Sequence, residues 1–165
     1  MTGTVLVTYG TTNGSTARIA ESIADVLRKS GLTVDIFPAP SVEDVARYDA
    51  VVAGGALYAG RWHRHARRFL RRHRRALADR PLWLFSSGPL DPSASERNIP
   101  PVPRLEKAMA ALDARGHVTF GGCLENGAKG WVARMILSDG KGGDFRDFTA
   151  IETWAAHVAE DLTRT

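Results

Sequence analysis

The sequence predicts an α/β protein in which five parallel strands form one sheet with helices on both faces. Short apolar runs, typical of buried strands, alternate along the chain with segments whose apolar residues recur at helical spacing. The 165 residues are 44% hydrophobic and 24% charged. That is the length and composition of one ordinary globular domain, here residues 1–165.

The first half of the chain is expected to hold three strands, at 4–8, 33–37 and 50–54. The segment 16–30 between the first two has a helical stripe and is followed by Gly31, a residue well suited to end a helix. A short helix is expected over 41–48, because Ser and Asp three residues apart resemble a capping box at its start.

The second half of the chain continues the alternation. A long helix is expected over 61–77, a strand at 81–86, a helix at 105–114, a strand at 118–121 and a last helix that starts from a capping box at 149–152. Five strands alternating with helices suit the sheet order 2-1-3-4-5. A sheet of that order binds its ligand at the carboxyl ends of strands 1 and 3.

Several classes of function are excluded by what the sequence lacks. There is no G-x-G-x-x-G followed by a suitably placed acidic residue, and no G-x-x-x-x-G-K-[ST], so dinucleotide and Walker nucleotide sites are not expected. No metal is expected either, because His63, His65 and His73 lack partners at metal-ligand spacing. The absence of a secretory pattern or a spanning apolar run predicts a cytoplasmic protein, with membrane association at most peripheral.

A loop rich in hydroxyl groups follows the first predicted strand and leads directly into a helix. It consists of Thr11, Thr12, Asn13, Gly14, Ser15 and Thr16. Helix N-termini bind anions because their unpaired N–H groups point at the ligand and the helix dipole favours negative charge. The pattern therefore fits a phosphate site, and it fits equally an ordinary turn in which Ser15 or Thr16 caps the helix.

This loop resembles the flavodoxin phosphate loop, T/S-x-T/N-G-x-T, which binds the phosphate of FMN. The segment 54–63 resembles the loop with which flavodoxins hold the flavin ring. Its pattern Tyr58-x-Gly60-x-Trp62-His63, followed by a basic helix, is similar to the flavodoxin-type, menaquinone-dependent protoporphyrinogen oxidases. Residues 131–136 and 142–144 also match the layout of that family, so the resemblance extends over nearly the whole chain.

The resemblance implies a flavodoxin-like three-layer sandwich with FMN as cofactor. The phosphate would be held by Thr11–Thr16. The ring would be flanked by two segments, Ala56, Leu57, Tyr58, Ala59 and Gly60 on one side and Ser86, Ser87, Gly88 and Pro89 on the other. Flavin chemistry belongs to the cofactor, so no catalytic acid or base is assigned.

The function implied by the resemblance is that of an FMN-dependent oxidoreductase. It would pass electrons from a reduced substrate, such as protoporphyrinogen, to a quinone. A simple flavodoxin-type electron carrier is the alternative within the same class. In another class, the alternative is a module that binds anions or nucleic acid through the arginine-rich helix.

The predicted helix at 61–77 carries eight arginines between Arg61 and Arg75. At 100° per residue all eight lie opposite an apolar stripe, which consists of Trp62, Ala66, Phe69, Leu70, His73 and Leu77. The arginines are either a solvated outer face or a surface that contacts an anionic membrane or an acidic redox partner. No specific nucleic acid is expected, because no aromatic residue lies on the arginine side to stack on bases.

Overall fold

A computed structural model of the chain describes residues 3–11, 14–58, 61–88, 99–121, 123–124, 143–144 and 146–164. Five parallel strands form the sheet, in the order β2-β1-β3-β5-β6. They are β1 (Thr4–Gly10), β2 (Thr33–Pro38), β3 (Ala50–Tyr58), β5 (Leu82–Ser87) and β6 (Gly116–Phe120). The predicted sheet and its strand order are confirmed, because β5 and β6 correspond to the fourth and fifth strands expected from the sequence.

Three further short strands lie outside that parallel set. Strand β4 (Arg61–Trp62) pairs antiparallel with the end of β3. Strands β7 (Cys123–Leu124) and β8 (Gly143–Asp144) pair with each other in a separate two-stranded sheet. The sequence did not predict any of the three, because two-residue strands are too short to leave a periodic pattern.

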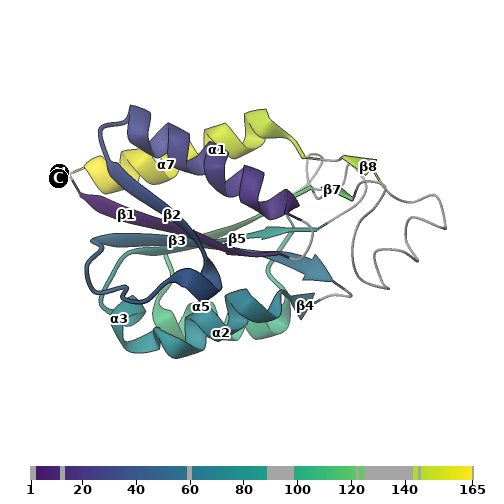
Figure 1. The fold of residues 1–165 in the computed structure, drawn as a ribbon, viewed down its shortest axis with the longest axis horizontal. Helices are drawn as coiled ribbons and strands as arrows, with labels where there is room; N and C mark the ends of the chain where they lie inside the picture. Colours follow the sequence, from purple (N-terminus) through teal and green to yellow (C-terminus); the bar gives the residue numbers. More distant parts are fainter. Residues whose placement is uncertain are drawn as a thin grey trace.

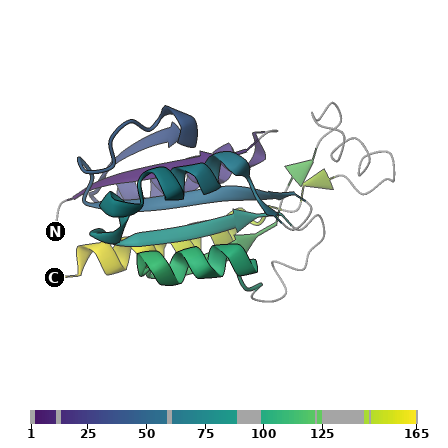
Figure 2. The ribbon, with the colours of Figure 1, turned by 90° about the horizontal axis from the view of Figure 1, so that it is seen from below.

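The helices form one layer on each face of the sheet (Figures 1 and 2). Helices α1 (Ser15–Lys29) and α7 (Phe148–Thr163) cover one face, and α2 (Arg64–Arg72), α3 (Arg74–Ala78) and α5 (Pro103–Leu112) cover the other. Alternate strand residues face opposite layers, as the pleat requires. In β1, Val5 and Val7 pack with α1 and α7, whereas Leu6 packs with the opposite layer.

The prediction of a short helix at 41–48 is wrong. The structure has a single 3₁₀ turn at Ala39–Ser41, followed by a loop. The Asp44 carboxylate accepts a hydrogen bond from the backbone N–H of Ala46 at 2.9 Å, and the Arg80 guanidinium donates to the Ala46 carbonyl at 2.9 Å. These two side chains form hydrogen bonds with the N–H and C=O groups of Ala46, which would pair with other backbone groups in a helix. The loop conformation can therefore compete with the helical one.

The long helix expected at 61–77 is also different in the structure. The helix begins only at Arg64 because Arg61 and Trp62 are paired with β3. His63 caps it, with Nδ1 accepting from the backbone N–H of His65 at 3.1 Å. At His73 the helix is interrupted, and a second helix, α3, starts at Arg74. The arginines therefore do not share one continuous helix face.

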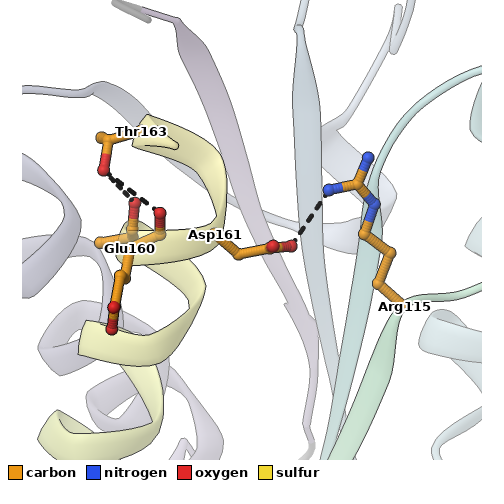
Figure 3. Close-up of polar contacts among 5 residues, drawn as sticks. Arg115, Glu160, Asp161 and Thr163 are labelled. Atoms are coloured by element: carbon orange, nitrogen blue, oxygen red, sulfur yellow. Dashed lines mark hydrogen bonds and ion pairs between the residues drawn. The ribbon is translucent and has the colours of Figure 1, made fainter. Parts of the chain in front are cut away.

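The cap of the C-terminal helix α7 lies two residues before the start of the predicted capping box. Its cap is Asp147, whose carboxylate accepts from the backbone N–H of Ala150 at 3.1 Å. Near its other end, Asp161 pairs with Arg115 at 3.0 Å and thereby joins α7 to the start of β6 (Figure 3). Both side chains are about half exposed, and so the pair contributes at most about 1 kcal/mol.

No helix in the described ranges is both long enough and apolar enough to cross a bilayer. The segment 131–136, which contributes to the family resemblance, lies outside the described residues, as does Gly142 of the segment 142–144.

Candidate functional site

The predicted cofactor segments meet at the carboxyl edge of the sheet. Gly10 at the end of β1 is in register with Gly55 on β3, and Ala56 is in register with Ser87 at the end of β5. The phosphate loop (11–16), the first ring segment (56–60) and the second ring segment (86–89) therefore lie at the ends of three adjacent strands, β1, β3 and β5. In Figure 1 this edge lies on the right, opposite the marked C-terminus.

The N-terminus of α1 is open toward this edge. Gly14 precedes the helix with a left-handed φ of 81°, and no side chain among the described residues caps the first turn. The backbone N–H of Gly14 donates to Thr11 Oγ1 at 3.3 Å, which folds the loop back toward β1. The first turn contains no acidic residue, so nothing there repels an anion. Thr12 and Asn13 lie outside the described residues, and Ser15 is described only in its backbone.

Two buried hydroxyl groups in the predicted cofactor segments have no hydrogen-bond partner in the described part of the chain. One is Thr16 Oγ1 in the first turn of α1, and the other is Ser87 Oγ at the end of β5. A buried hydroxyl that is left unpaired costs about 1–3 kcal/mol. The residues therefore fit a ligand that supplies hydrogen-bonding groups here, as the phosphate and the polar ring edge of FMN would.

The first ring segment, residues 56–60, begins within a β-strand, whereas the sequence predicted a loop there. Strand β3 continues past the predicted end at residue 54 and reaches Tyr58. It then returns as a hairpin, in which Leu57 pairs with Trp62. The backbone N–H of His63 donates to the Ala56 carbonyl at 2.8 Å and closes this hairpin. Ala59 and Gly60 lie outside the described residues, and of Tyr58 only the backbone is described.

The two ring segments touch each other through Leu57 and Gly88. A Cβ atom on Gly88 would lie only 2.7 Å from the Cβ of Leu57, so a side chain at position 88 would displace the first ring segment. The backbone N–H of Gly88 donates to the Phe120 carbonyl at 3.1 Å and holds the turn against β6. Pro89 lies outside the described residues.

Ser86 uses its side chain for a contact that the sequence did not predict. Its Oγ lies 2.8 Å from Nε2 of His117, on the neighbouring strand β6. Burial lowers the pKa of His117 to about 4, so the imidazole is neutral at physiological pH. The Ser86 side chain is thus bound within the protein, and its backbone lies in the sheet between β3 and β6.

His63 is buried beside the first ring segment. Burial lowers its pKa to about 4, and the nearby positive charges of His65, Arg64 and Arg67 act in the same direction. A neutral imidazole keeps the lone pair on Nδ1 with which His63 caps α2. Within the described residues there is no group of three or more His, Cys, Asp or Glu side chains that could hold a metal ion.

A family model described as the flavodoxin domain matches residues 6–138. No curated protein sequence matches. Among solved structures, a point mutant of a flavodoxin from Pseudomonas aeruginosa has a TM-score of 0.65 at 14% identity, with 98% of this chain and 99% of that chain covered. The other similar structures include oxidoreductases.

An NADH:FMN oxidoreductase named EmoB gives a TM-score of 0.64 at 15% identity over 99% of this chain and 92% of that one. The rubredoxin oxygen:oxidoreductase of Desulfovibrio gigas gives 0.64 at 13% identity, and the match covers 96% of this chain but only 36% of that protein. The family model spans most of the sequence, so the chain belongs to the flavodoxin-domain family, a family of FMN-binding redox proteins. Its cofactor is FMN.

Proposed function

We propose that the chain is an FMN-dependent oxidoreductase that takes electrons from a reduced substrate, with protoporphyrinogen as the candidate, and passes them to a quinone. The observation that carries this proposal is the positive charge beside the first ring segment. Arg61 and Arg64 are exposed there, and α2 contains no carboxylate. Cations near the flavin favour its fully reduced, negatively charged form, which suits an enzyme that collects two electrons from a substrate.

In this proposal the chain binds and orients the cofactor. Thr11–Thr16 hold the phosphate through the N–H groups of α1 and the hydroxyl of Thr16. Residues 56–60 and 86–89 flank the ring, with the Ser87 hydroxyl at its polar edge. FMN itself supplies the electron-transfer chemistry.

A simple electron carrier is the second candidate. It is favoured by the match to whole flavodoxins, since the Pseudomonas aeruginosa protein is covered over 99% of its length. A carrier would need no substrate site, and the same cofactor segments would serve it unchanged.

The proposed partners follow from the same charges. The arginines between Arg61 and Arg75 would attract an acidic redox protein or an anionic membrane that carries the quinone. Such contact would be peripheral and weakened by salt, in a protein that we expect to be cytoplasmic.

The first experiment is the visible spectrum of the purified protein, followed by identification of the released flavin. FMN at one per chain is expected. The double substitution Thr12→Asp with Ser15→Asp should abolish binding, because two carboxylates would face the phosphate. The matched control, Thr149→Asp with Thr153→Asp, adds the same charge to exposed positions on α7 and should retain the flavin. Full flavin content in the first variant would contradict the assignment of the loop.

The second experiment separates the enzyme from the carrier. The holoprotein is mixed with protoporphyrinogen and a menaquinone analogue in the absence of oxygen, and porphyrin formation is followed by fluorescence. Repeated turnover supports the oxidoreductase. If FMN is reduced by a chemical donor and reoxidised by an electron acceptor, but no porphyrin forms, the chain is a carrier.

A further inference from the structure

A groove runs along the face of the molecule that carries α2, α3 and α5, with a volume of about 880 Å³. The groove lies between α2 and α3 on one side and α5 on the other, and these helices lie side by side on the near face of the sheet in Figure 2. Its lining includes Trp62 and Val102 near the carboxyl edge, and Ala78 and Leu112 toward the opposite edge. The groove therefore extends along the length of α5, about 15 Å for ten residues.

The lining combines an apolar floor with basic walls. Leu70 and Leu105 form part of the floor, and both are buried in the core beneath it. Six arginines line the groove: Arg61, Arg67, Arg71, Arg74, Arg75 and Arg104. Arg64, Arg68 and Arg72, all on α2, do not line it. The structure thus divides the arginines of this region into a groove set and an outer set.

The groove arginines have no acidic partners within the described residues. In that part of the chain, none of the six forms an ion pair. The Nε atom of Arg67 is buried and has no hydrogen-bond acceptor there. A buried guanidinium donor without an acceptor is unfavourable, and an anion in the groove would satisfy it.

The shape and lining of the groove select one kind of occupant. Its volume falls within the roughly 300–1,000 Å³ typical of small-molecule sites, whereas protein partners usually dock on broader surfaces. The apolar floor suits a hydrocarbon body. Among the described residues, Trp62 is the only aromatic one in the lining and is 2% exposed, so stacking of a nucleotide base is not favoured. Arginine side chains match the planar geometry of a carboxylate.

We propose that the groove between α2–α3 and α5 binds an amphipathic small-molecule carboxylate, with its hydrocarbon body on the apolar floor and its acid group paired with Arg67 and the neighbouring groove arginines. This site involves a different face of the molecule from the phosphate loop, and it does not require the proposed electron transfer. The outer arginines play no part in it.

The test uses the purified, flavin-loaded protein and myristate as the probe, at concentrations where the acid is monomeric. Isothermal titration calorimetry should show one site per chain. Myristyl alcohol, which has the same chain without the charge, and butyrate, which has the charge without the chain, should each bind at least about tenfold more weakly. Equal binding of the acid and the alcohol would overturn the proposal.

Two pairs of variants locate the site. Arg67→Gln with Arg71→Gln should weaken myristate binding about tenfold or more, and the outer pair Arg64→Gln with Arg68→Gln should leave it unchanged. Ala111→Trp places a bulky ring in the groove at an exposed position of α5 and should block the ligand. Its control, Ala110→Trp, is equally exposed and lies outside the lining.

The remaining outcomes concern other partners. Equal effects of the groove and outer variants would overturn the assignment to the groove. If the protein binds vesicles of anionic phospholipid but not monomeric myristate, the arginines form a membrane-contact surface and the small-molecule site is wrong. Binding of neither probe would also overturn it. In each case flavin content is measured separately, so failure of the groove site is distinguishable from failure of the proposed function.

Discussion

The indole Nε1 of Trp62 donates a hydrogen bond to the backbone carbonyl of Phe85 at 3.3 Å, and the rings of these two residues cover opposite faces of β3. A Cβ atom on Gly54 would come within 1.9 Å of the Phe85 ring, and one on Gly55 within 2.6 Å of the Trp62 ring. The last residues of β3 before the first ring segment are therefore enclosed by two aromatic side chains. The position of that segment depends on both rings.

Gly54→Ala is expected to destabilise the protein by about 2–4 kcal/mol, because the added methyl group overlaps the buried Phe85 ring, which cannot move away without disturbing the core. The free energy of urea unfolding measures this. The control is Gly116→Ala, where the nearest atom would be 3.3 Å away on Trp83, and a much smaller loss is expected there. Similar losses at the two positions would contradict the role of the Phe85 contact.

Thr16→Val should lower the affinity for FMN by about tenfold without destabilising the apoprotein. The hydroxyl has no partner among the described residues, so its removal costs nothing until the ligand is present. Fluorescence titration of the apoprotein with FMN gives the affinity, and thermal unfolding gives the stability. A loss of apoprotein stability with unchanged affinity would show that the hydroxyl is structural.

The positive charge beside the ring segment should raise the reduction potential of bound FMN. Arg61→Glu is expected to lower the potential on the order of 40 mV, which for one electron corresponds to about 1 kcal/mol, the scale of a partly exposed charge pair. Spectroelectrochemical titration measures it. Arg75→Glu, the same change in α3 beyond the break at His73, should have a much smaller effect. A potential that does not respond to Arg61→Glu would remove this support for the oxidoreductase.

Stability should fall as the pH drops from about 6.5 toward 4. His117 has its pKa lowered to about 4 in the folded protein, whereas in the unfolded chain it titrates near 6.5. Between these values the unfolded state takes up a proton that the folded state does not, so acidification favours unfolding. The loss from this residue is about 3 kcal/mol and is complete below pH 4.

His117→Gln should flatten this dependence, measured as the free energy of urea unfolding at pH 7 and pH 4.5. The matched substitution His157→Gln changes an exposed histidine on α7. If both substitutions flattened the profile equally, the assignment to His117 would be wrong.

The parts of the site that could be predicted are those set by neighbouring residues in the sequence. The apolar run at 50–54 predicted a buried strand. The hydroxyl-rich loop after 4–8 predicted a helix start, and it left open whether that start binds a phosphate or is capped by Ser15 or Thr16. Their meeting at one edge followed from the parallel topology. The pair of Ser86 and His117 could not be predicted, because it depends on the register between β5 and β6.

Contacts between residues far apart in the sequence also explain why the helices predicted at 41–48 and 61–77 differ in the structure. Segment 41–48 has the pattern of a helix start, but Arg80, more than 30 residues away, satisfies its backbone carbonyls. The periodicity of 61–77 is real, yet pairing of Trp62 with Leu57 removes the first turn from the helix. The groove was not predictable either, since its second wall comes from α5, and only the packed structure brings Arg104 close to the arginines of α2.

The distribution of charge across the sheet gives the molecule an electric polarity. Helices α2 and α3 carry seven arginines and no carboxylate, whereas α7, in the opposite layer, carries Glu152, Glu160 and Asp161 and no lysine or arginine. In the field of an anionic body the protein would rotate before contact, with α2 and α3 turned toward that body and α7 away from it. The two bodies then meet in a preferred orientation rather than a random one. The distance at which this orientation begins becomes shorter as ionic strength rises, because salt screens the charges.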